Sequence, residues 1–244
     1  LYYQHTTGIY DRCMRVVDRS KGQSWWNWVM ARFPRPLVKG FFSLSGTNLS
    51  IPQEKLLDVL QNPERLLDLF KVSQEQGVAI DGRTLEEIHR HMETVSDETF
   101  CSPLASQAFR DILSGPGAVA QTLTLMHQAR VLEKLVPAFG RVRGLMQFNQ
   151  YHKYTVDEHS LFTVREVERI GRQEGIFHDV YKEIPGKDIL HLAALLHDIG
   201  KPQTKTVESD GRIRFLGHGN LGAETSQSIM DRLRFCLLYT SDAA

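Results

Sequence analysis

The sequence has 244 residues, which is enough for one large domain or two small ones. Its 29 Lys and Arg residues balance 29 Asp and Glu residues, so the net charge is zero and a broadly basic nucleic-acid-binding surface is excluded. No apolar run approaches the roughly 18 residues that a membrane span requires. The three cysteines form no CxxC pair, which argues against a disulfide framework and predicts a cytoplasmic setting.

The two ends of the chain do not resemble natural termini. The chain begins with Leu1, and its last nine residues, 236–244, resemble the translation of a sequencing-library adaptor. They interrupt an amphipathic pattern in mid-helix. We therefore interpret 236–244 as a sequencing artefact and expect the rest to be an internal fragment of a longer protein.

Residues 1–148 are expected to form an irregular helical array. Asn62-Pro63 and Ser102-Pro103 both place a capping residue before a proline, the pattern that begins a helix. Gly77 is expected to end the first of these helices. Further helices are expected from near Thr84 and over residues 119–135.

Residues 149–235 are expected to form a second helical domain. Thr155 and Glu158 form a capping box that starts a helix extending to about Ile170. Residues 189–196 are apolar on nearly every side, which predicts a central buried helix. Residues 206–215 predict a small β-hairpin, and a last helix is expected to begin near Leu221.

His197 and Asp198 follow directly after this apolar helix. Burying an imidazole beside a carboxylate is costly unless something compensates it. A divalent metal ion compensates both, because imidazole nitrogen and carboxylate oxygen are common metal ligands. His159, one turn into the capped helix, is the natural further ligand, and His218 is a second candidate.

Other histidines lack this context. His178-Asp179 is the same pair in a polar segment and is expected at the surface. His191 is two helical turns, about 10.5 Å, from Asp198, so it is expected to be a core histidine. His127 has no neighbours in the sequence that predict a role.

The arrangement of His159 followed by His197-Asp198 resembles the HD superfamily of metal-dependent phosphohydrolases. The motifs Tyr-Thr-Val-Asp-Glu-His159 and Leu-Leu-His-Asp-Ile-Gly-Lys201, with the helices upstream of them, are similar to the bacterial bifunctional uridylyltransferase/uridylyl-removing enzymes. The similarity covers roughly residues 50–235. It implies an all-α fold, in which residues 1–148 link an upstream nucleotidyltransferase domain to a truncated HD domain at 149–235.

The resemblance also implies a function. The expected reaction is hydrolysis of the uridylyl-tyrosine phosphodiester of the PII nitrogen-regulatory protein, which releases UMP. His159, His197 and Asp198 are the expected ligands of Mn²⁺ or Mg²⁺. Lys201 is expected to offer positive charge to the phosphate. His218 is a candidate ligand, phosphate contact or general acid.

Two alternative functions are compatible with the same motifs. The segment between Asp198 and His218, with its hairpin, is more similar to HD domains of CCA-adding and poly(A) polymerase-type nucleotidyltransferases. Such a domain hydrolyses 2′,3′-cyclic or 2′-phosphates, although zero net charge argues against a tRNA surface. The second alternative is a non-catalytic HD-like binding module, which is disfavoured because the ligand residues are intact.

The family motif ends with a distal Asp, and Asp231 is the only candidate for it in this sequence. Asp231 lies close to residue 236 in a short terminal helix, and we do not expect it to be the matching residue. Losing a carboxylate ligand removes charge compensation as well as a bond. We therefore expect residues 1–235 to bind Mn²⁺ or Mg²⁺ weakly and to hydrolyse little.

Overall fold

The structure is a computed structural model that describes residues 37–115, 118–146, 154–209 and 212–235. The α-helices and 3₁₀ helices in these residues are η1 (Gln53–Lys55), α3 (Leu56–Leu60), α4 (Pro63–Gln76), α5 (Gly82–Met92), η2 (Asp97–Phe100), α6 (Pro103–Ser114), α7 (Val119–Gln128), α8 (Val131–Leu135), α9 (Pro137–Val142), α10 (Val156–Ile170), α11 (Ile176–Glu183), α12 (Lys187–Leu196), α13 (Lys201–Thr204) and α14 (His218–Arg232). The strands are β1 (Leu37–Val38), β2 (Phe42–Ser45), β3 (Asn48–Ser50), β4 (Ala79–Ile80), β5 (Thr206–Val207) and β6 (Ile213–Arg214). The prediction of a predominantly helical fold is confirmed.

Most of the predicted helix boundaries are confirmed. Ser102 caps α6 by accepting a hydrogen bond from the Ala105 amide at 3.0 Å. Gly77 ends α4 in the left-handed conformation, with φ of +62°. Asn62 precedes α4 as expected, but its side chain does not cap the helix. It donates instead to the Asp58 carbonyl oxygen at 2.6 Å, so the capping role predicted for this side chain is wrong.

A small sheet that the sequence did not predict lies before and beside α4. Its strands follow the order β1-β2-β3-β4. Strands β2 and β3 pair antiparallel with Leu44 opposite Leu49, and β3 pairs parallel with β4 with Leu49 opposite Ile80. Leu49 is fully buried, so the sheet closes one end of the helical core.

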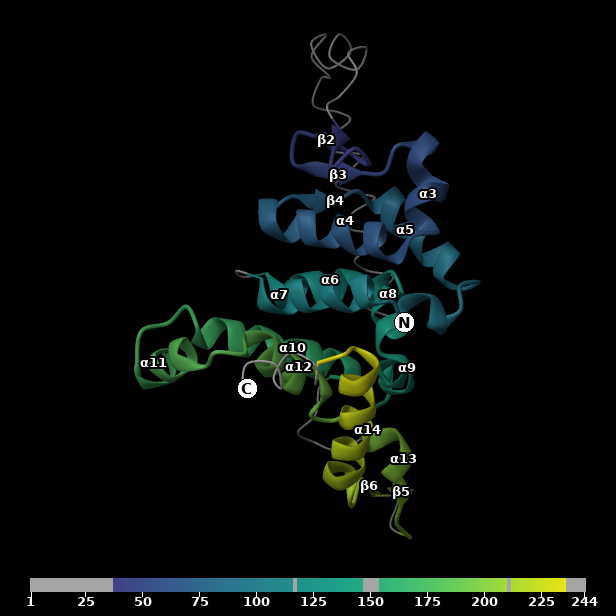
Figure 1. Cartoon of the computed structure of the whole chain (residues 1–244). Helices are drawn as coiled ribbons and strands as arrows, with labels where there is room; N and C mark the ends of the chain where they lie inside the picture. Colours follow the sequence, from purple (N-terminus) through teal and green to yellow (C-terminus); the bar gives the residue numbers. More distant parts are fainter. Residues whose placement is uncertain (1–36, 116–117, 147–153, 210–211, 236–244) are drawn as a thin grey trace, which may run out of the picture. The chain divides into compact units, whose positions relative to one another are not determined.

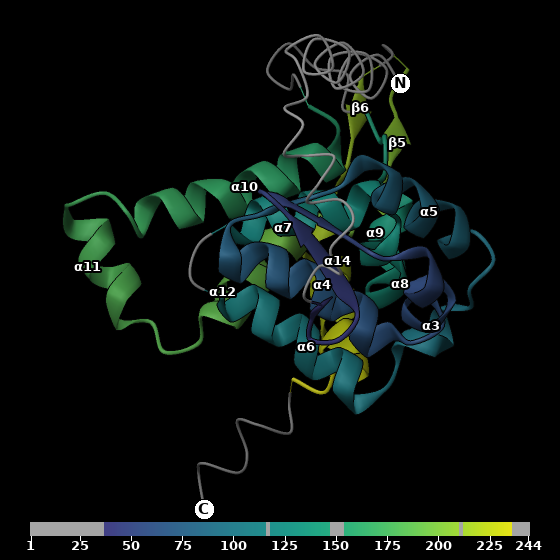
Figure 2. The same ribbon diagram turned by 90° about the horizontal axis from the view of Figure 1, so that it is seen from above.

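A series of packed helices leads from this sheet to the second half of the chain (Figure 1). Helix α4 packs on α6, α6 packs on α12, and α12 packs on α10. Helix α10 also packs along α7, as Figure 2 shows from above. The described helices on either side of residue 148 therefore share one hydrophobic core, whose fully buried members include Phe109, Leu123, Val164 and Leu195.

The second half contains the predicted hairpin, in which β5 and β6 pair with Val207 opposite Ile213. Helix α14 begins at His218 and not near Leu221, so His218 is the first residue of this helix. Among the residues that the structure describes, no helix combines the length and apolar character needed to cross a bilayer.

Candidate metal centre

Three ligand-type side chains meet where α10 and α12 pack together. His159 comes from the second turn of α10, while His197 and Asp198 follow the end of α12. Asp198 Oδ2 lies 3.3 Å from His197 Nε2 and 3.9 Å from His159 Nε2. The rings of His159 and His197 are 5.1 Å apart and meet edge to face. One potential ligand atom from each residue lies within 4.8 Å of the others.

The start of α10 is fixed by local sequence. Thr155 and Glu158 form the predicted capping box, in which Glu158 Oε2 accepts from the Thr155 amide at 3.2 Å. The helix continues to Ile170, as predicted. The box therefore determines where the helix begins, and with it which turn carries His159.

Lys201 and His218 surround the same carboxylate. Lys201 Nζ donates to Asp198 Oδ2 at 2.6 Å, and both side chains are buried. His218 Nε2 lies on the other side, 3.9 Å from Asp198 Oδ1. The structure thus brings together all five residues that the sequence predicted for the site.

Glycine permits the close approach that places His218. A Cβ atom on Gly200 would lie 2.3 Å from the His218 carbonyl oxygen and 2.7 Å from the Gly222 amide nitrogen. Real Cβ atoms essentially never come this close to backbone. The turn after Asp198 can therefore pack directly on the first turn of α14 only because residue 200 has no side chain.

Hydrogen bonds orient two of the imidazoles. His197 Nδ1 lies 2.9 Å from the Ala194 carbonyl oxygen, and His218 Nδ1 lies 2.7 Å from the Phe215 carbonyl oxygen. A carbonyl only accepts, so each Nδ1 carries the proton. In both residues Nε2 faces Asp198. A protonated ring can donate from this atom toward the carboxylate, whereas a neutral ring presents a lone pair there that can bind a metal.

Burial and charge together decide the protonation of Asp198. Burial alone raises the pKa of this carboxyl, but hydrogen bonds from His197 and Lys201 outweigh burial and hold the pKa well below its usual range. The hydrogen bond with Asp198 raises the pKa of His197, against the opposing effect of burial. Asp198 is therefore an anionic group in the metal-free structure.

The donor set fits a divalent cation. It combines two imidazole nitrogens with one ionised, buried carboxylate, and one potential ligand atom of each residue lies within 4.8 Å of the others. One expectation from the sequence was wrong. The His197 side chain is 36% exposed, so only the Asp198 charge is buried and in need of compensation.

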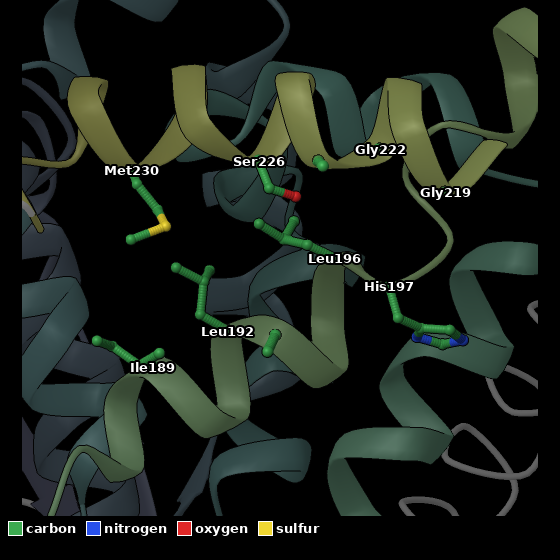
Figure 3. Close-up of a pocket in the computed structure, with 10 residues that line it drawn as sticks. Ile189, Leu192, Leu196, His197, Gly219, Gly222, Ser226 and Met230 are labelled. Atoms are coloured by element: carbon green, nitrogen blue, oxygen red, sulfur yellow. The ribbon is translucent and has the colours of Figure 1, made fainter. Parts of the chain in front are cut away.

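A groove of about 280 Å³ begins at His197 and extends between α12 and α14. Figure 3 shows Ile189, Leu192 and Leu196 of α12 facing Gly222, Ser226 and Met230 of α14 across it. The lining residues are mostly apolar, and Gly219 and Gly222 have no side chains to narrow the groove. A flat apolar group of a ligand bound at His197 has room here.

The other histidines are placed elsewhere. Asp179 is exposed, and His178 Nδ1 lies 3.0 Å from the Gly171 carbonyl oxygen. His191 is buried in the core, with Nδ1 2.6 Å from the Leu113 carbonyl oxygen. Asp231 is exposed and accepts a hydrogen bond from Gln227. Within the described ranges, His159, His197 and Asp198 make the group suited to hold a metal.

Sequence reasoning missed one buried histidine. His127 is 8% exposed, and its Nε2 lies 3.0 Å from Oδ2 of the buried Asp157. Thirty positions separate the two residues, so no short-range pattern connects them. The apolar neighbours of His127 in α7 and the place of Asp157 inside a capping box were the only available signals.

Comparison with known families agrees with this geometry. Residues 156–243 match the HD domain family, and this range contains Asp198 and the four site residues around it. The helices that carry the site therefore lie within the segment that matches the HD domain family. Residues 42–135 match the family described as the uridylyltransferase GlnD third domain.

Curated proteins with similar sequences also indicate a uridylyl-removing enzyme as the relative of this chain. A bifunctional uridylyltransferase/uridylyl-removing enzyme of Erythrobacter litoralis is 30% identical over 202 residues, which is 80% of this chain and 20% of the relative. The enzyme of the same name from Caulobacter vibrioides is 33% identical over 201 residues, again 80% and 20%. The one from Methylococcus capsulatus is 37% identical over 147 residues, 57% and 17%. The chain is similar to these enzymes over most of its length, and it spans about a fifth of the length of these curated relatives.

Proposed function

We propose that this chain contributes the hydrolytic site of a uridylyl-removing enzyme, which cleaves the phosphodiester of uridylyl-tyrosine on PII and releases UMP. The observation that carries the proposal is the buried Asp198 carboxylate with the Nε2 atoms of His159 and His197 facing one of its oxygens. The names of the relatives support uridylyl removal as the reaction.

In this proposal His159, His197 and Asp198 hold Mn²⁺ or Mg²⁺. The ion, when bound, acts as a Lewis acid toward the phosphate and lowers the pKa of a bound water. Asp198 stays ionised throughout, because Lys201 and His197 stabilise its charge. The exposed sides of the His159 and His197 imidazoles remain accessible to substrate.

Lys201 and His218 act on the substrate in different ways. The Lys201 ammonium lies at the carboxylate, where it adds positive charge close to the phosphate. His218 is 40% exposed on the opposite side of Asp198, so its ring is accessible to a phosphate oxygen or to the leaving tyrosine oxygen. The groove beyond His197 receives one of the two rings that flank the phosphodiester.

The same proposal includes a domain boundary at residue 148 and a cytoplasmic location for the protein.

The third-domain match upstream of the HD match favours a uridylyl-removing enzyme over the HD domain of a CCA-adding enzyme. Zero net charge supports the same choice against a tRNA substrate.

The test uses the 244-residue chain with a uridylyl-tyrosine peptide and Mn²⁺ or Mg²⁺. We expect slow release of UMP that EDTA abolishes and Asp198→Asn eliminates, and no ring opening of 2′,3′-cyclic nucleotides to nucleoside monophosphates. Preferred hydrolysis of the cyclic nucleotides would support the tRNA-processing alternative. Release of UMP that is unaffected by Asp198→Asn would contradict the proposed site.

A further inference from the structure

Four charged side chains are buried together beneath the start of α10. His127 Nε2 lies 3.0 Å from Asp157 Oδ2, and His127 Nδ1 lies 2.9 Å from Glu133 Oε1. Arg143 completes the cluster with a contact of 2.8 Å from its Nε to Glu133 Oε1. All four side chains are less than one-fifth exposed. We call these four residues the His127 cluster.

The His127 cluster crosses the boundary between the two family matches. His127 and Glu133 belong to α7 and α8, within residues 42–135, whereas Asp157 belongs to the HD match. It is also where α10 packs along α7 (Figure 2). The first turn of the helix that carries His159 is thus attached to the preceding domain by a polar contact.

Stability alone does not explain such a cluster. Removing several charges from water costs free energy that their mutual attraction barely repays, and apolar residues of similar size often stabilise a fold at least as well. What a buried polar pair adds is geometry, because hydrogen bonds are strong only within a narrow range of distances and angles. The cluster therefore specifies how α10 is placed.

Helical geometry connects this placement to His159. Asp157 and His159 are two residues apart, so their side chains leave the helix about 200° from each other. Asp157 points to His127 in the core, and His159 consequently points to the opposite side, where its ring meets His197. A rotation of the first turn that loosened Asp157 would also turn His159 away from Asp198.

Asp157 also ties this turn to the segment before it. Its Oδ1 accepts a hydrogen bond from the Gly144 amide at 3.1 Å. Next to it, the Val156 amide donates to the Leu145 carbonyl oxygen at 3.0 Å. Asp157 thus joins three segments, namely α7 through His127, the residues that follow α9 through Gly144, and α10 itself.

We propose that Asp157, held by His127, is a positioning residue that fixes the rotation of the first turns of α10 and so directs the His159 imidazole toward His197 and Asp198. This inference rests on the proposed metal centre for its function, but the orientation of His159 is a property of the metal-free chain. Asp157 itself touches neither metal nor substrate.

Glu168 provides a matched control on the same helix. It is a buried carboxylate that also contacts α7, where it accepts hydrogen bonds from the Val119 and Ala120 amides at 2.9 and 2.8 Å. It lies nine residues after His159, more than two turns away. Loss of Glu168 therefore weakens the contact between α10 and α7 without releasing the turn that carries His159.

The experiment compares Asp157→Ala and Glu168→Ala in the 244-residue chain by two measurements. The first is the His159 imidazole NMR resonance without metal, identified by its loss in His159→Gln and shifted by the nearby His197 ring. The second is Mn²⁺ affinity by calorimetric titration. We expect Asp157→Ala to move the resonance toward that of an exposed histidine and to weaken Mn²⁺ binding about 10-fold, as loss of ligand-orienting residues does. Glu168→Ala should change neither, and Asp157→Asn should retain most of the affinity.

The inference is overturned if Asp157→Ala leaves the His159 resonance in place, or if both variants move it equally. If Asp157→Ala does not fold, the experiment is repeated with His127→Asn. His191→Asn, which alters another buried histidine, is then the control. A parent chain that does not bind Mn²⁺ would refute the proposed metal centre. The resonance would still decide whether Asp157 positions His159.

Discussion

Lys201 donates a hydrogen bond to Asp198 across 2.6 Å, and the oxygen atom that accepts it is the one that also faces His159 and His197. A bound cation and the lysine therefore interact with the same carboxylate oxygen. In the metal-free chain Lys201, together with His197, compensates the charge of Asp198, whose side chain is 6% exposed.

Replacing Lys201 by Met keeps the apolar stem and removes this compensation. Without metal, Lys201→Met should lower the free energy of unfolding by about 3 kcal/mol, because it leaves a buried carboxylate without its cationic partner. Saturating Mn²⁺ should reduce the deficit, since the ion then supplies positive charge to the same oxygen. Urea unfolding with and without Mn²⁺ measures both values.

The exposed Lys205 provides the control for this measurement. Lys205→Met should change the free energy of unfolding by no more than about 0.5 kcal/mol, as surface substitutions usually do. An equal deficit for Lys201→Met with and without Mn²⁺ would contradict a metal ion at Asp198.

The two His-Asp pairs of the chain give a second prediction. His197→Ala and Asp198→Asn should each abolish Mn²⁺ binding in calorimetric titration, because each removes one ligand from a set of three. His178→Ala should leave binding unchanged, as should Asp179→Asn, whose side chain is exposed. Loss of Mn²⁺ binding in the second pair would show that the metal lies elsewhere.

The residues that meet at the candidate site were predicted from short-range patterns, whereas parts of the fold around them were not. His197 and Asp198 were recognisable because a polar pair follows an apolar helix, and His159 because a capping box marks the start of its own helix. These signals lie within a few residues of each site residue. Local physical chemistry was therefore enough to find them.

Longer-range features had no such signal. Strands β2, β3 and β4 are two to four residues long, too short for alternating polarity to be visible, and β4 pairs with β3 across the whole of α4. The contact between His127 and Asp157 likewise depends on how α7 and α10 pack. Neither follows from the residues next to it in the chain.

Gly200 gives a third prediction, which concerns the position of His218. Gly200→Ala places a Cβ atom against the backbone of His218 and Gly222, so the first turn of α14 must move. Overpacking of this kind typically costs about 1–3 kcal/mol of stability. We expect this loss in urea unfolding, together with a shifted His218 imidazole NMR resonance.

Gly219→Ala is the matched control, because nothing lies within 4 Å of a Cβ atom at that position. It should fold with unchanged or slightly higher stability, since Ala favours a helix more than Gly does. Equal effects of the two substitutions would show that close packing at Gly200 does not position α14.

The last prediction concerns the pH dependence of stability that the His127 cluster creates. Burial lowers the pKa of His127, but hydrogen bonds with Asp157 and Glu133 outweigh burial and the repulsion from Arg143, so the pKa is raised in the folded chain. A group whose pKa is higher in the folded state stabilises the fold below its unfolded pKa, which is about 6.5 for His. This contribution is lost as the pH rises through the folded pKa of His127.

The pKa of Glu133 is shifted in the opposite direction. Burial raises it, yet His127 and Arg143 together lower it, so Glu133 stabilises the fold above its unfolded pKa of about 4.3 and loses this effect in acid. Stability from the cluster should therefore be greatest between about pH 5 and 6.5. Urea unfolding of the metal-free chain from pH 4 to 9 should show a decrease on the alkaline side that His127→Gln reduces, with the remainder due to His197, whose pKa is also raised. The same decrease in His127→Gln and in the parent chain would mean that another group causes it and that His127 is not charged in the folded protein.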